Sequence, residues 1–124
     1  MRLPALLAAY IALAGCGQAS AAAIDPADDV HCSVLAFYFH GFAEHHGFPA
    51  AQVKAAKGVH DWYAARMRLI AKERWGDMAG FEKEAAPLLE AIKADPLAMR
   101  DEMAACTERA AAEPAFNQHA RAYR

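Results

Sequence analysis

Apolar residues recur at helical spacing in four successive segments of the chain, residues 25–47, 49–75, 78–94 and 95–112. Within each segment they return every three or four positions, which places them on one face of an α-helix. The clearest rows are Val53, Ala56, Val59, Tyr63, Met67 and Ile70 in the second segment, and Phe81, Ala85, Leu88 and Ile92 in the third. The pattern predicts four amphipathic helices.

Turn and capping residues separate these segments. Asp25-Pro26 and Asp95-Pro96 each place an N-cap and a first-turn proline at the start of a helix. Gly47 and Gly76 end the first and second helices. Pro87 lies inside the third apolar row, and since the row stays in phase across it we expect a kink rather than a break. Short connections between amphipathic helices predict an all-α fold, an antiparallel up-and-down four-helix bundle.

The first residues of the chain have a different pattern. Met1-Arg2 is a short positive start, residues 3–14 carry no charge, and small residues follow. This is the layout of a secretory signal, and the apolar run is shorter than the roughly twenty residues of a membrane-spanning helix. We therefore expect residues 1–21 to be a signal peptide, 22–114 a four-helix domain and 115–124 a C-terminal tail. An uncleaved anchor that continues through Ala23 is the alternative.

Two cleavage sites compete at the end of this leader. Leu13-Ala14-Gly15-Cys16 resembles the lipobox of bacterial lipoproteins. The resemblance implies cleavage before Cys16, lipidation of its thiol and an anchor in a membrane. Ala19-Ser20-Ala21 instead fits ordinary signal peptidase, with cleavage before Ala22. Both routes predict a periplasmic protein, tethered in the first case and free in the second.

Cys32 and Cys106 are the two cysteines left for pairing, because lipidation uses Cys16 and ordinary cleavage discards it. An even pair in an oxidising compartment favours a disulfide. Cys32 lies near the start of the first predicted helix and Cys106 near the end of the fourth. Antiparallel neighbours would bring these two positions level, so we expect one disulfide that joins the first and last helices. Two unconnected buried thiols are the alternative.

Length, charge and missing motifs narrow the class of protein. A chain of 124 residues forms one domain, and its net charge of −2 gives no reason to expect a nucleic-acid partner. No G-x-S-x-G or C-x-x-C-H motif occurs, so we expect neither an enzyme nor a haem or other cofactor. The sequence thus favours a binding or structural module of the cell envelope, whose partner is an unknown protein or envelope ligand.

Histidine is the one enriched reactive residue type, with six in the chain. His40 and Glu44 are four residues apart on one helix face, a spacing at which two side chains can bind one metal ion. The alternatives are an exposed structural pair, or a pH-responsive protein whose histidines gain charge below about pH 6.5. His60 and Asp61 are adjacent, and because adjacent helix residues point about 100° apart we do not expect the side-chain hydrogen bond of a catalytic dyad.

The second predicted helix is basic. Its cations could face anionic lipid or an envelope polymer, or simply form a solvated face. They are Lys54, Lys57, Arg66, Arg68, Lys72 and Arg74, against the two acids Asp61 and Glu73.

One early V-x-C motif, Val30-His31-Cys32, and one late cysteine, Cys106, give the chain a further resemblance. It resembles small exported two-cysteine helical proteins of Gram-negative bacteria. The resemblance implies export and a helical fold, and no site residues.

Overall fold

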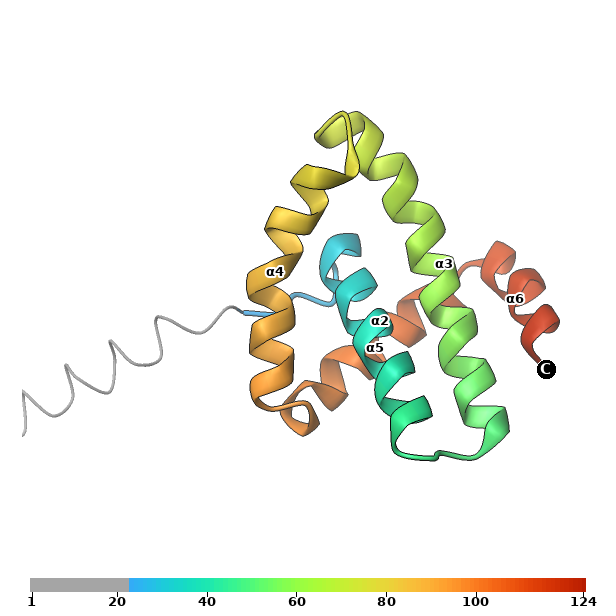
Figure 1. The fold of residues 1–124 in the computed structure, drawn as a ribbon. Helices are drawn as coiled ribbons and strands as arrows, with labels where there is room; N and C mark the ends of the chain where they lie inside the picture. Colours follow the sequence, from blue (N-terminus) through green and yellow to red (C-terminus); the bar gives the residue numbers. More distant parts are fainter. Residues whose placement is uncertain (1–22) are drawn as a thin grey trace, which may run out of the picture.

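The computed structural model describes residues 23–124, so the leader and Cys16 lie outside the described residues. Every regular element of this part of the chain is helical, which confirms the all-α prediction (Figure 1). The α-helices are α2 (Asp29–His45), α3 (Ala50–Arg74), α4 (Met78–Ala94), α5 (Arg100–Ala111) and α6 (Pro114–Ala120), and the 3₁₀ turns are η1 (Leu97–Met99) and η2 (Arg121–Tyr123). None of the helices described here combines the length and apolarity needed to cross a membrane.

Helix α2 lies at the centre of the fold (Figure 1). It runs antiparallel to α3, with which it forms the most extensive helix pair, and α4 packs against it as well. From the turn at Gly76, α3 and α4 diverge and lie on either side of α2, and α5 crosses behind α2 (Figure 1). Because α2 lies between them, α3 and α4 are further apart than neighbouring helices of the expected bundle (Figure 1).

The start of α2 differs from the prediction. The N-cap is Asp28, whose side chain accepts hydrogen bonds from the main-chain N–H groups of Val30 (2.7 Å) and His31 (3.4 Å). The predicted N-cap, Asp25, instead accepts from the N–H of Ala27 at 2.9 Å. An aspartate that bonds the backbone two residues ahead forms a local turn, so the helix begins only after it.

The other boundaries follow the capping residues more closely. Helix α3 begins directly after Pro49, and α4 spans 78–94 as predicted, continuing through Pro87. Gly47 and Gly76 have φ values of +66° and +80°, the left-handed conformation that suits glycine at a helix end. The fourth predicted helix is divided, because η1 precedes α5.

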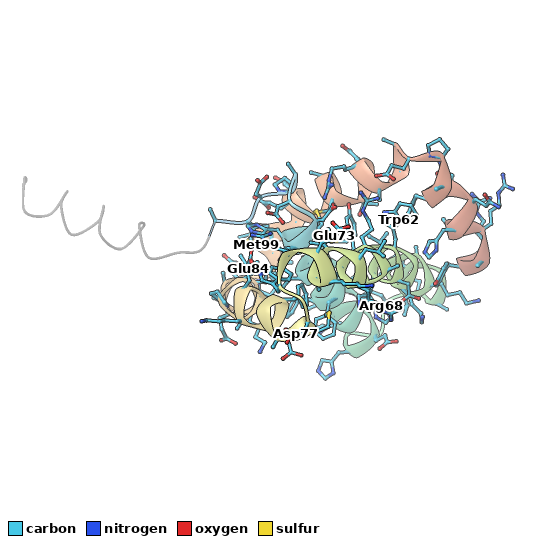
Figure 2. All side chains as sticks on the ribbon, turned by 90° about the horizontal axis from the view of Figure 1, so that it is seen from above. Trp62, Arg68, Glu73, Asp77, Glu84 and Met99 are labelled. Atoms are coloured by element: carbon cyan, nitrogen blue, oxygen red, sulfur yellow. A yellow bond between two sulfur atoms is a disulfide. The ribbon has the colours of Figure 1, made fainter. Side chains whose placement is uncertain are left out.

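Residues 115–124, expected as a tail, contribute to helical structure that packs along α3. Phe116 of α6 is buried, and its ring meets that of Trp62 edge-on at 5.4 Å between centroids. In Figure 2, Trp62 projects from α3 on the side where α6 lies. The C-terminal residues are therefore part of the packed domain.

The core surrounds a disulfide between Cys32 in α2 and Cys106 in α5. Both cysteines are fully buried, and their Cα atoms are 5.6 Å apart. The predicted pairing is confirmed, although α6 follows α5, so Cys106 is not in the last helix. The largest fully buried side chains beside them are Tyr63, Leu35, Met67, Ile92 and Val30.

A candidate ligand cleft between α2, α3 and α4

A cleft of about 550 Å³ lies between α3 and α4, and α2 contributes to its lining. Most of the lining side chains are apolar. The lining consists of Ser33, Val34 and Phe37 from α2, His60, Ala64, Met67 and Arg68 from α3, and Met78, Phe81, Glu82, Ala85, Ala86 and Leu89 from α4. Cavities of this size and character are typical of sites for small organic ligands.

Alanines leave part of the space between α3 and α4 unfilled. Ala64 faces the cleft from α3, and Ala85 and Ala86 face it from α4. A methyl group is too short to cross the gap that the diverging helices leave, whereas a leucine or phenylalanine would partly fill it. The helices hold the cleft open, and these small side chains make it accessible.

Two large apolar side chains of the cleft remain in contact with solvent. Phe37 is 57% exposed and Met78 is 41% exposed. A ligand that covers apolar surface of this kind lowers the free energy by about 25 cal/mol per Å² buried. The exposed lining therefore favours occupation by an apolar molecule.

Four polar residues interrupt this lining: Ser33, His60, Arg68 and Glu82. Ser33 is only 6% exposed, whereas Arg68 and Glu82 are exposed. Arg68 lies on a different side of α3 from Trp62 (Figure 2). Among the described residues Arg68 has no ion-pair partner, which leaves its charge free to meet a ligand.

His60 links this cleft to a second hollow of about 430 Å³ near the end of α2. The imidazole rings of His60 and His40 stack with 5.7 Å between centroids and 10° between planes. His60 Nδ1 also lies 3.3 Å from Asp61 Oδ1. The two side chains therefore approach each other although their Cα–Cβ directions diverge, and the hydrogen bonds that Asp61 accepts come from other partners.

Asp61 connects α3 with the C-terminal residues. Its Oδ2 accepts hydrogen bonds from Lys57 Nζ at 2.7 Å and from the Tyr123 hydroxyl at 2.6 Å. Burial alone would raise the pKa of the Asp61 carboxyl, but these two hydrogen bonds outweigh it and lower that pKa. Burial lowers the pKa of the His60 imidazole, and the neighbouring His40 acts in the same direction, against an opposing attraction from Asp61.

The predicted metal pair is brought together without further ligands. His40 Nε2 lies 3.2 Å from Glu44 Oε1, but the contact does not have the geometry of a hydrogen bond. His45 and His46 are exposed at the end of α2. Within residues 23–124, no three histidine, cysteine, aspartate or glutamate side chains are arranged to hold a metal ion. A metal at His40 and Glu44 would thus have only two protein ligands.

Comparison with known proteins gives no relative. No protein-family model matches the chain, and no curated protein or solved structure is significantly similar to it.

Half of the basic residues of α3 form ion pairs within the molecule. Arg66 bonds Glu113 at 3.0 Å and contacts Asp29 at 3.4 Å, and Arg74 bonds Glu84 at 3.1 Å. With Lys57 bound to Asp61, three of the six cations of the helix have acidic partners. The basic pattern in the sequence thus includes structural ion pairs, and Arg68 is the cation that lines the cleft.

Arg109 forms contacts next to the disulfide. Arg109 of α5 donates to Asp29 Oδ1 at 2.6 Å and to the carbonyl of Pro26 at 3.0 Å. One of its guanidinium nitrogens lies 3.3 Å from Cys32 Sγ. These contacts tie α5 to the start of α2 at the same place as the disulfide. Sequence reasoning missed them, since residues 80 positions apart carry no local signal of their pairing.

Proposed function

We propose that this protein is an exported, non-enzymatic binding module of the cell envelope that holds a small apolar ligand between α2, α3 and α4. The observation that carries the proposal is the apolar cleft, whose size lies within the range of small-molecule sites. In this proposal α2 to α5 act as one up-and-down bundle opened between α3 and α4, and α6 completes its other side.

Export is supported by the leader and by the buried disulfide together. The leader has the order of a secretory signal, and a structural disulfide is stable in an oxidising compartment. Mass spectrometry of the mature N-terminus in a bacterial host tests this part. An acylated Cys16 indicates a lipid-anchored form, and a start at Ala22 indicates a free periplasmic form. Retention of Met1 in the membrane fraction indicates the uncleaved anchor, whereas retention of Met1 in the cytoplasm would contradict export.

Ligand binding is tested with a neutral fluorescent probe, N-phenyl-1-naphthylamine, whose emission rises in apolar surroundings. The wild-type protein is expected to bind it saturably. Ala64→Trp places an indole in the cleft and should abolish this binding, whereas Ala65→Trp, on the exposed side of the same helix, should not. Ala86→Trp offers a second block from α4, at an exposed position that tolerates a large side chain.

Two outcomes would reject the cleft as a ligand site. One is the absence of saturable probe binding to the folded wild-type protein. The other is binding that Ala86→Trp and Ala65→Trp change equally while circular dichroism shows both variants to be folded.

A second candidate function, response to pH or metal, is favoured by the stacked rings of His40 and His60. Two imidazoles in contact repel when both are protonated, so acid would loosen α2 from α3 at this point. Metal analysis of the purified protein separates the two forms of this candidate. Bound zinc, copper or nickel that is lost in His40→Ala/Glu44→Ala would support the metal form, and its absence would leave only the pH response.

A further inference from the structure

The charges at the cleft indicate the chemistry of its ligand, if the cleft binds one as proposed above. We infer that the cleft binds a single-chain anionic amphiphile, such as a medium-chain fatty acid, with its chain against the apolar lining and its carboxylate at Arg68. A guanidinium that has no ion-pair partner within residues 23–124 and lies beside apolar surface complements a molecule with one negative end and one apolar end.

Arg68 is the group best suited to the anionic end. Arg66 and Arg74 of the same helix already bind carboxylates, and neither lines the cleft. Burial lowers the pKa of His60, so this imidazole is neutral at pH 7 and contributes no permanent charge. Arg68 therefore supplies the lasting positive charge of the lining, and Glu82 the negative one.

The shape of the lining suits an extended chain. Its residues on α3 run from His60 to Arg68, eight residues or about 12 Å along the helix axis at 1.5 Å per residue. Apolar side chains face this length from the other two helices, including Val34 of α2 and Phe81 of α4. A linear alkyl chain can follow such a path with its polar end at Arg68. Glu82 on α4 disfavours a ligand that carries a second negative charge.

Displacement of the neutral probe measures the preference directly. Decanoate, decanol and decyltrimethylammonium share the same alkyl length and differ in the charge of their head groups, and each is used below its micelle concentration. Decanoate is expected to compete about three- to tenfold better than decanol, the range for one partly exposed charge-assisted contact. Decyltrimethylammonium should compete least well.

Variants of one position assign the preference to Arg68. Arg68→Gln should remove the advantage of decanoate while leaving decanol competition unchanged, and Arg68→Lys should retain part of it. Lys72→Gln is the matched control, because Lys72 is an exposed cation one turn further along α3 that does not line the cleft. Its removal should leave the preference intact.

The outcomes separate this inference from the proposed function. If decanol displaces the probe as well as decanoate does, the cleft binds apolar ligands but the inference is wrong. If Arg68→Gln and Lys72→Gln weaken decanoate equally, a diffuse positive charge acts rather than Arg68, which also overturns it. Binding to phosphatidylglycerol vesicles without binding to monomeric decanoate would assign the charge to a membrane surface and reject a soluble ligand. Failure of the probe itself to bind would reject the proposed function first.

Discussion

The phenol of Tyr63 donates a hydrogen bond of 2.5 Å to the main-chain carbonyl of Cys106, one of the two disulfide residues. Tyr63 is only 1% exposed, and burial raises the pKa of its hydroxyl, which therefore remains a proton donor over the physiological range. The bond joins α3 to α5 at the place where the disulfide joins α2 to α5. Three helices are thus held together around one buried point.

Removal of this hydroxyl should destabilise the fold without altering its shape. Tyr63→Phe keeps the buried ring and leaves the carbonyl without its tyrosine partner, which should lower the free energy of unfolding by about 1–2 kcal/mol. Urea denaturation followed by circular dichroism measures the change. Tyr38→Phe is the control, because Tyr38 is half-buried and its hydroxyl has no hydrogen bond within the described residues. Equal stability of Tyr63→Phe and wild type would show that the bond adds nothing.

Loss of the disulfide should cost more. Cys32 and Cys106 are 74 residues apart in sequence, and closing a loop of that length stabilises by about 4–5 kcal/mol in the chain-entropy model. Domains of this size have a total stability of about 5–15 kcal/mol. We therefore expect Cys32→Ala/Cys106→Ala to unfold at much lower urea concentration than the oxidised wild type. A reducing agent should shift the wild-type transition and leave that of the double variant unchanged.

Two results would contradict this role of the disulfide. One is a non-reduced wild-type protein that reacts with two equivalents of a thiol reagent after unfolding. The other is a double variant whose urea midpoint equals that of the oxidised protein.

Gly58 allows the C-terminal residues to dock on α3. A Cβ atom at this position would lie 3.1 Å from Cγ of Tyr123, and His119 Nε2 lies 2.9 Å from the Gly58 carbonyl. Alanine in a helix is about 1 kcal/mol more favourable than glycine, but here that gain is opposed by displacement of the Tyr123 ring. We expect Gly58→Ala to stabilise the protein by about 1 kcal/mol only when Tyr123→Ala has removed the ring.

A double-mutant cycle of these substitutions measures the coupling by urea denaturation. The expected sign is a gain from Gly58→Ala in the Tyr123→Ala background that is larger than its gain in the wild type. An identical effect of Gly58→Ala in both backgrounds would show that the ring does not depend on the glycine.

The local part of this fold follows from local sequence signals. The apolar rows and the residues at the helix ends predict α3 and α4 nearly residue by residue, because a 3.6-residue period and a left-handed glycine act within a few positions. The start of α2 was misplaced because Asp25 and Asp28 are both good capping residues. Only the competing turn at Asp25 decides between them.

The cleft could not be predicted in the same way. It depends on the angle between α3 and α4, which the packing of α2 between them sets, and on alanines such as Ala64 that read as ordinary helix formers. The contact between His60 and Asp61 depends on side-chain rotamers, which helical spacing does not specify. The C-terminal helix was missed because its anchor, Phe116, is a single large apolar residue in a short segment.

Acid should destabilise the folded protein through the environment of His60. Burial lowers the pKa of this imidazole in the folded protein below its ordinary value of 6.5. The unfolded chain therefore binds the proton more readily, so the contribution of neutral His60 to stability is present above pH 6.5 and is lost as the pH falls through the folded pKa. The titratable groups that act on the ring are His40 from α2 and Lys57 and Asp61 from α3. Arg68 of α3 and Glu82 of α4 line the same cleft as His60, and Glu44 of α2 contacts His40.

The contribution of Asp61 to stability is also lost on acidification, but in a lower pH range. Its pKa is lowered from 3.8, so its contribution is lost only in stronger acid, and the interval from pH 6.5 down to about 5 reports mainly on the histidines. His60→Gln should reduce the loss of stability across this interval, measured by urea denaturation at closely spaced pH values. His46→Gln removes an exposed histidine and should leave the loss as in wild type. A His60→Gln profile with the wild-type slope would show that protonation of this ring does not weaken the α2–α3 contact, because the titrating group would then lie elsewhere.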